Sequence, residues 1–250
     1  DLKYGEFSLE EGDSYSVEYL LAGDREEPVC QVENGTLVVK EGDFGETQEG
    51  NRWYFRLWGE EGERRQDDPY VKITVPKGAR LKAVSVDVPW DIDLAANLSA
   101  EKLSVKTSYG EIKMEDWDGT NLSIYDENGD IKTGNLTGDK VEITGLYGDL
   151  NIGCIESAQA SLEAENGSVT VFAGTQGTLD VKNSYGDTNI YGMQKADAYG
   201  YDLRTEYGKI YFSGYEMMEN ENGDAAEYRK QAPGSAVIRV SAENGDIKIR

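Results

Sequence analysis

The feature that most constrains this chain is a turn dipeptide that recurs at a fixed interval. Tyrosine or asparagine precedes glycine at each turn, and the glycines of the first five turns follow one another every 19 residues: Gly110, Gly129, Gly148, Gly167 and Gly186. Two more turns follow, at Gly208 and Gly245, after intervals of 22 and 37 residues. We interpret the longer intervals as single repeats with insertions, the larger one at 216–234. Such a period indicates a stack of similar structural units.

Apolar residues occupy four fixed positions around each turn: seven and five residues before the glycine, and two and four residues after it. In the third repeat these are Val141, Ile143, Leu150 and Ile152. The interleaved positions are mostly polar or charged, so each repeat predicts two short strands with one buried face. We expect glycine at the turn because the backbone there enters positive φ, which residues with a Cβ atom avoid.

Two architectures share this alternation. Asn-Gly between alternating runs favours a β-hairpin, but a meander or sandwich of hairpins would leave the apolar columns on one open face. Nothing else in the chain is large enough to cover that face. A solenoid buries the columns between the two strands of each coil, with coils about 4.8 Å apart. The pattern therefore predicts an all-β fold, a parallel β-solenoid (β-helix) of roughly seven coils of about nineteen residues.

The solenoid is expected to occupy residues 81–250, with the insertion at 216–234 shielding its far end. The coil before Gly110 is degenerate, but its apolar residues fit the columns if the turn lies at Pro89-Trp90; they are Val84, Val86, Ile92 and Leu94. Residues 1–80 lack the spacing and are predicted to form a β-rich N-terminal cap, continuous with the solenoid, because an open terminal coil exposes unpaired strand edges.

Several segments together resemble a bacterial putative-adhesin β-repeat family. They are the Gly-Asp-Ile turns in Asn128–Ile131 and Asn244–Ile247, the strand Asn34–Val39, and the pair Val71–Pro76 and Leu81–Val86. The resemblance covers nearly the whole chain. It implies a right-handed parallel β-helix and an extracytoplasmic place in the bacterial cell envelope or at the cell surface, often behind a membrane anchor. That family has no established catalytic residues, so none is transferred to this chain.

Composition excludes several classes of function. The formal charge is −23, from 25 basic and 48 acidic residues. Such a surface repels phosphate backbones and anionic lipids, so we expect no nucleic-acid partner. The chain has no histidine, which removes Ser-His-Asp and Cys-His catalysis and histidine-ligated zinc. No cofactor-binding or metal-binding motif occurs, and we expect neither a cofactor nor catalysis.

Membrane and redox features are sparse. No apolar run is long enough to span a bilayer, so we expect no transmembrane segment in this sequence. The sequence starts at Asp1 rather than Met, and we expect that a signal or membrane anchor could precede it. The two cysteines, Cys30 and Cys154, do not make a disulfide framework and are expected to be free.

The turns supply the candidate binding surface. Its residues are Tyr109, Tyr147, Tyr185, Tyr207, Asp130, Asp149 and Asp187. The tyrosines could stack on sugars or anchor a protein partner, or they could stack within the molecule, on the Asn or Tyr of the neighbouring coil, and hold the coils in register; the second interpretation is favoured. The carboxylates could hold Ca²⁺ or simply form a solvated edge, and again the second is favoured.

An aromatic cluster in the cap has two interpretations as well. Trp53, Tyr54, Phe55 and Trp58 could form a recognition patch, but they are expected to cover the apolar end of the solenoid.

The sequence thus predicts a non-catalytic binding or scaffold protein of the bacterial envelope, whose partner is an envelope protein or a glycan. The alternative is a polysaccharide-acting solenoid enzyme, since such enzymes use pairs of carboxylates without histidine. Asp116 and Asp118, on either side of Trp117, are its best local candidates. They fall at a coil corner, where aspartate is common in turns.

Overall fold

The computed structural model describes residues 5–23, 28–42, 51–56, 69–174, 177–192, 198–212, 215–218, 225–231 and 234–250. Within these ranges the regular elements are strands, without an α-helix. The strands are β1 (Glu6–Gly12), β2 (Ser16–Gly23), β3 (Val29–Glu33), β4 (Thr36–Lys40), β5 (Asn51–Arg56), β6 (Tyr70–Pro76), β7 (Arg80–Asp87), β8 (Ile92–Leu94), β9 (Leu98–Thr107), β10 (Ile112–Met114), β11 (Trp117–Asn128), β12 (Ile131–Thr133), β13 (Leu136–Tyr147), β14 (Leu150–Asn166), β15 (Val169–Ala173), β16 (Thr178–Tyr185), β17 (Thr188–Tyr191), β18 (Gly200–Thr205), β19 (Ile210–Phe212), β20 (Tyr215–Met218), β21 (Ala226–Lys230), β22 (Val237–Asn244) and β23 (Ile247–Ile249).

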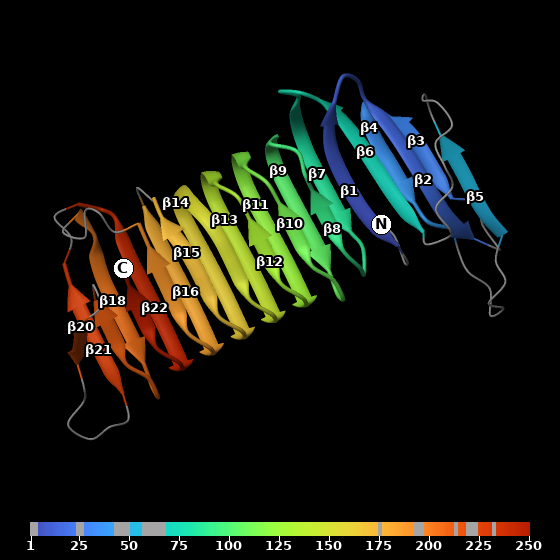
Figure 1. Ribbon diagram of the computed structural model, residues 1–250. Helices are drawn as coiled ribbons and strands as arrows, with labels where there is room; N and C mark the ends of the chain where they lie inside the picture. Colours follow the sequence, from blue (N-terminus) through green and yellow to red (C-terminus); the bar gives the residue numbers. More distant parts are fainter. Residues whose placement is uncertain are drawn as a thin grey trace.

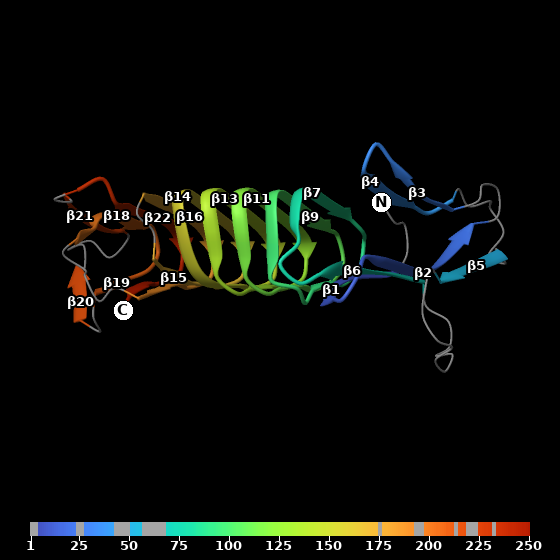
Figure 2. The same ribbon diagram turned by 90° about the horizontal axis from the view of Figure 1, so that it is seen from above.

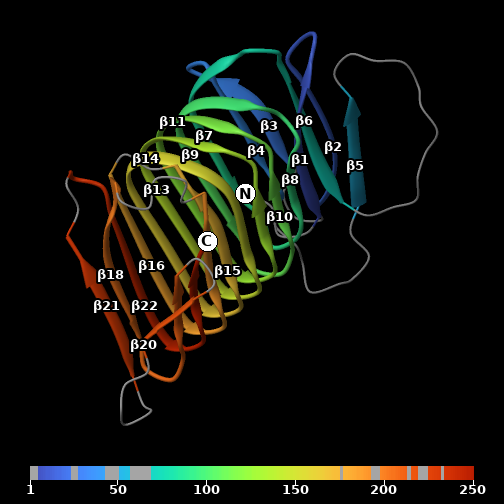
Figure 3. The same cartoon turned by 60° about the vertical axis from the view of Figure 1, so that its left-hand side comes forward.

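The repeats stack side by side along one axis, with a long and a short strand in each (Figures 1 and 2). The long strands β7, β9, β11 and β13 pair in parallel, and so do the short strands β8, β10 and β12. The register places equivalent residues opposite one another, for example Ile112 with Ile131 and Ile131 with Leu150. Figure 3, turned towards the axis, shows the coils following one another as a curled sheet. The predicted all-β, mainly parallel stack is confirmed.

The core lies between the long and the short strands and runs through the stack. The apolar column residues are buried in every repeat, apart from the half-buried Thr133 and Phe212. Val86, Ile92 and Leu94 are also buried, and β8 pairs with β10 with Ile92 opposite Ile112. The degenerate first coil therefore exists as expected, with its turn at Pro89-Trp90.

The last coil of the sequence is not the last coil of the stack. Strand β22 pairs with β16 on one side and with β18 on the other, and β23 likewise lies between β17 and β19. Figure 1 shows the red β22 between the orange β16 and β18. Stacking in chain order, which the succession of turns predicts, is wrong for the last two coils. The antiparallel strands β20 and β21 then pair with β19 and β18.

The N-terminal strands continue the sheet at the opposite end. Strand β1 lies in parallel between β6 and β8, while β2 pairs antiparallel with both β5 and β6. A separate hairpin, β3–β4, turns at Asn34 and Gly35, whose φ angles of 50° and 78° are both positive. Positive φ at both turn residues is what a two-residue hairpin requires. The aromatic cluster predicted at 53–58 lies outside the residues whose side chains are described.

The repeated turn glycines are needed for two different reasons. Gly148, Gly167, Gly186 and Gly245 have φ between 142° and 155°, as expected. Gly129 does not have positive φ, so the expected reason is wrong there. A Cβ atom on Gly129 would instead lie 1.8 Å from the carbonyl oxygen of Gly110 in the preceding coil. Close approach of stacked backbones, rather than φ alone, excludes side chains from this column.

Candidate binding surface

The turns of successive coils form one edge of the stack, and tyrosine and asparagine alternate along it. Register pairs Asn128 with Tyr147, Tyr147 with Asn166, Asn166 with Tyr185 and Tyr185 with Asn244. Tyr207 completes the series, because its N–H donates to the carbonyl oxygen of Glu243, 2.8 Å away. The alternation is regular only because the last coil of the sequence lies between Tyr185 and Tyr207.

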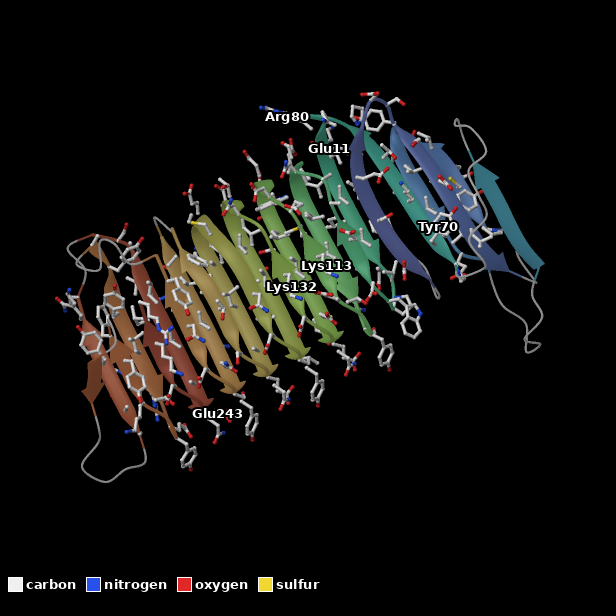
Figure 4. The ribbon with its side chains drawn as sticks, viewed as in Figure 1. Glu11, Tyr70, Arg80, Lys113, Lys132 and Glu243 are labelled. Carbon is white, nitrogen blue, oxygen red and sulfur yellow. The ribbon has the colours of Figure 1, made fainter. Side chains whose placement is uncertain are left out.

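Tyrosine is exposed along this edge, whereas asparagine is half-buried. The exposed fractions are 58% for Tyr109, 53% for Tyr147, 54% for Tyr185 and 67% for Tyr207. We call these four side chains the tyrosine row. Figure 4 shows ring-bearing side chains projecting one after another from the turn edge of the stack.

The tyrosines do not stack on one another. Adjacent parallel strands are about 4.8 Å apart, so tyrosines in every second coil are about 9.6 Å apart. Aromatic rings in contact have centroids about 4.5–7 Å apart. Contact between these tyrosines therefore does not hold the coils in register, and stacking on the asparagines of the neighbouring coils stays a prediction. At the first coil Tyr109 does contact a ring, that of Trp90, with centroids 6.3 Å apart.

The carboxylates beside the tyrosine row serve the turns. Oδ1 of Asp130 accepts the N–H of Asp149 at 2.9 Å, and Oδ1 of Asp149 accepts the N–H of Ser168 at 2.7 Å. Oδ1 of Asp187 accepts the N–H of Asp246, again at 2.9 Å. Each aspartate thus satisfies a backbone donor in the next coil through one oxygen. This geometry gives the three residues a structural role.

Lysines partly neutralise the same edge. Lys113 and Lys132, labelled in Figure 4, contact Glu111 at 2.8 and 2.6 Å. Hydrogen bonds from these two ammonium groups lower the pKa of Glu111. Lys248 contacts Asp187 in the same way. Over the described part of the chain, no group of three or more acidic or thiol side chains is arranged to hold a metal ion.

A set of buried polar side chains lies next to the turns, at a position that the apolar pattern of the sequence did not single out. That position lies three residues before the turn glycine and is buried in all seven coils; it is polar in four of them and is Gly145, Ala164 or Ala242 in the other three. Asp126 at this position is buried; its Oδ1 accepts the N–H of Asn128 at 3.1 Å, and its Oδ2 has no partner. Burial raises the pKa of Asp126 to about 7. In three other coils a side chain at this position donates to a turn carbonyl: Thr107, Asn183 and Thr205.

The residues of the alternative enzyme hypothesis flank a buried tryptophan at a corner of the coil. Trp117 is buried in the core, and its ring occupies space left by Gly119 and Gly138, where a Cβ would lie 2.5 and 2.7 Å from ring carbons. Asp116 accepts the N–H of Asn135 at 2.7 Å, which makes it part of the corner turn. Asp118 is exposed on the strand beyond it.

Two further expectations concern cysteines and membranes. Cys30 and Cys154 are both free, as predicted. Cys30 lies in the β3–β4 hairpin rather than in a solenoid column. None of the described segments forms a helix long and apolar enough to cross a membrane.

These features define a stacked β-repeat protein with an exposed aromatic edge. The chain belongs to the Toastrack DUF4097 family, whose model matches residues 6–250. No curated protein matches the chain. A solved structure from Clostridium sporogenes, described as a putative cell adhesion protein, aligns with 99% of this chain and 89% of its own, at 11% identity and a TM-score of 0.27.

Proposed function

We propose that this chain is a non-catalytic binding or scaffold protein of the bacterial envelope or cell surface, of the adhesin type. The observation that carries the proposal is the tyrosine row: four exposed rings at regular intervals on one edge of a stacked sheet. Exposed aromatic side chains dominate recognition surfaces, and regular stacks present extended surfaces for interaction. We also propose that the stack is a right-handed solenoid with coils of nineteen residues.

An extracytoplasmic location belongs to the same proposal. The acidic surface, with formal charge −23, disfavours nucleic acid and anionic lipid as partners. A neutral glycan or an envelope protein fits it better. Of the two carboxylates that the sequence offered for catalysis, Asp116 is engaged in the corner turn through its hydrogen bond with the N–H of Asn135, which supports a structural role for it.

Binding to intact envelopes tests the proposal. Fluorescently labelled protein should bind isolated bacterial envelopes saturably, and the double variant Tyr147→Ala/Tyr185→Ala should bind several-fold more weakly. Tyr15→Ala is the matched control, because Tyr15 is 65% exposed but lies in the cap, away from the row. Equal loss in the control, no saturable binding by the unaltered chain, or release of sugars from the envelopes would contradict the proposal.

A further inference from the structure

The tyrosine row has a spacing that a ligand could match. The rings recur at about 9.6 Å, twice the distance between strands. Between them, asparagine side chains lie against the neighbouring coil: Asn128 donates to the carbonyl oxygen of Ser108 at 2.9 Å, and Asn244 donates to that of Ser184 at 3.5 Å. Along this edge, exposed tyrosine rings therefore alternate with asparagine amides that are hydrogen-bonded to the backbone. We call this alternating row the comb.

We propose that this comb binds an extended, neutral β-1,4-linked glycan; this inference rests on the proposed binding function and specifies its ligand. In such a glycan each pyranose is turned over relative to the one before it, so every second ring presents the same face. The disaccharide repeat is close to twice the strand spacing. One tyrosine can then stack on the same face of each disaccharide, because the electron-rich face of the ring attracts polarised C–H groups.

The length of the comb sets the length of the ligand. Six coil-to-coil steps separate Tyr109 from Tyr207, with Asn128, Tyr147, Asn166, Tyr185 and Asn244 between them. The row is therefore about 29 Å long at the usual strand spacing. A glycan of about seven or eight sugars spans the four rings.

The polar groups beside the rings suit sugar hydroxyls. Asp130 and Asp149 use Oδ1 for the turns, and a carboxylate has further acceptor sites on its second oxygen. Hydroxyl groups of a neutral sugar can donate to those oxygens. A glycan with carboxylate or sulfate groups would meet repulsion from the same column, so the proposal is limited to neutral chains.

Polypeptides fit the edge less well. A peptide in β conformation repeats each side at about 6.6 Å, which does not match the rings. A polyproline II helix repeats at about 9.3 Å and does match, but such helices dock into aromatic-lined grooves. The hollows of about 340 and 350 Å³ lie on the outer face of the long strands, and their linings include none of the four tyrosines. Because the four rings are exposed at the edge of the stack, the row suits a flat ribbon of sugars.

Calorimetric titration of the full chain with matched oligosaccharides tests the proposal. Cellohexaose and chitohexaose are both extended and β-1,4-linked, and they distinguish glucose from N-acetylglucosamine. Maltohexaose has the same glucose units as cellohexaose but curls because its links are α-1,4. We expect at least one β-1,4 hexasaccharide to bind at least about tenfold more tightly than maltohexaose, with affinity rising from four sugars to eight.

Variants separate ring spacing from ring number. Tyr147→Ala should weaken hexasaccharide binding about threefold to tenfold, while Tyr147→Phe should retain it. The exchange variant Asn128→Tyr/Tyr147→Asn keeps the composition but puts two tyrosines in adjacent coils, and it should bind as weakly as Tyr147→Ala. Thermal midpoints show whether each variant is folded; they are expected to be unchanged for the two single Tyr147 variants, because that side chain is exposed, and to fall slightly for the exchange variant, which loses the hydrogen bond from Asn128 to Ser108.

Four outcomes would overturn the inference: no binding of either β-1,4 glycan, equal binding of maltohexaose, undiminished binding by the exchange variant, or preferential binding of a polyproline decapeptide. Failure here is distinct from failure of the proposed function. If the glycans do not bind but the unaltered chain still binds envelopes through the tyrosine row, only the glycan inference is lost.

Discussion

At the scale of single residues, the turn column leaves no room for a Cβ atom. The ideal Cβ position on Gly129 lies 1.8 Å from the carbonyl oxygen of Gly110, and that on Gly148 lies 2.0 Å from the same atom of Gly129. Both neighbours are backbone atoms of the adjacent coil rather than the ends of flexible side chains, so room for a Cβ would require the stacked backbones to shift. A substitution in one coil therefore strains its neighbour as well.

Gly129→Ala is expected to lower the free energy of unfolding by about 1–3 kcal/mol, the usual cost of overpacking. Gly234→Ala is the matched control, because no atom lies within 4 Å of its ideal Cβ and its φ is not in the left-handed region. The control should change stability by less than about 0.5 kcal/mol. Urea denaturation measures both; equal midpoints for the two variants would refute the steric explanation.

Asp126 makes stability depend on pH. Its carboxyl is buried, and burial raises its pKa from 3.8 to about 7, so the folded chain binds a proton that the unfolded chain releases. The protonated carboxyl stabilises the folded chain relative to the unfolded chain. This stabilisation is complete below about pH 4 and is lost as the pH rises towards 7. The loss is at most about 1.4 kcal/mol per pH unit.

Asp126→Asn should remove this dependence. Asn183 occupies the equivalent position and donates to the carbonyl oxygen of Gly186 at 3.0 Å, so an amide fits the column. We expect the variant to be more stable than the unaltered chain at pH 8 by about 1–3 kcal/mol, since it no longer buries a charge. Chemical denaturation at pH 5 and pH 8 is the measurement. Parallel stability profiles for the two proteins would show that Asp126 is ionised in the fold.

At the scale of elements, the position of β22 between β16 and β18 brings opposite charges together. Arg239 of β22 contacts Asp180 of β16 at 3.0 Å and lies in register with Asp202 of β18. Stacking in chain order would instead place Asp202 beside Asp180, and like charges directly opposite each other destabilise a sheet. The charge pattern and the alternation of tyrosine with asparagine favour the same order of coils.

Engineered disulfides distinguish the two orders. With Cys30 and Cys154 replaced by alanine, the pair Asp180→Cys/Arg239→Cys should cross-link, because directly opposite residues of adjacent strands lie within disulfide reach. The pair Asp180→Cys/Asp202→Cys is the control: these residues are two strands, about 9.6 Å, apart, beyond the reach of a disulfide. Mass spectrometry after mild oxidation gives the answer. Efficient cross-linking of the control pair alone would show that β18, rather than β22, lies beside β16.

At the scale of the whole molecule, the formal charge of −23 acts as a diffuse field rather than as a metal site. The aspartates beside the tyrosine row each have one oxygen committed to a turn, and the described residues hold no cluster of three metal-ligating side chains. Ca²⁺ needs six to eight oxygen ligands. Cations should accumulate along the edge without a closed coordination shell.

Thermal melts in Ca²⁺, Mg²⁺ and NaCl should therefore show small upward shifts that monovalent salt largely reproduces at matched ionic strength, because screening relieves the self-repulsion. The shifts should grow gradually with concentration. A large shift that saturates at micromolar Ca²⁺ would contradict this and would assign the Gly-Asp turns a specific calcium site.

Sequence alone was enough to predict the strands, the inward columns and the stacking. Val141, Ile143, Leu150 and Ile152 alternate with polar residues, and alternation on a strand fixes which face is buried, whatever strand lies beside it. These properties are local, which is why a single repeat already contains them.

Only the tertiary structure decided which coils are neighbours. Asn34-Gly35 forms a hairpin, whereas Asn128-Gly129 joins the long and the short strand of one coil, although the dipeptide is the same, because the flanking strands find different partners. Likewise, β18 and β22 carry the same apolar pattern, and backbone hydrogen bonds do not distinguish them. Their order follows from matching across strands, Arg239 with Asp180 and Asn244 with Tyr185. That matching appears only when segments distant in sequence lie side by side, and it gives the tyrosine row its even spacing.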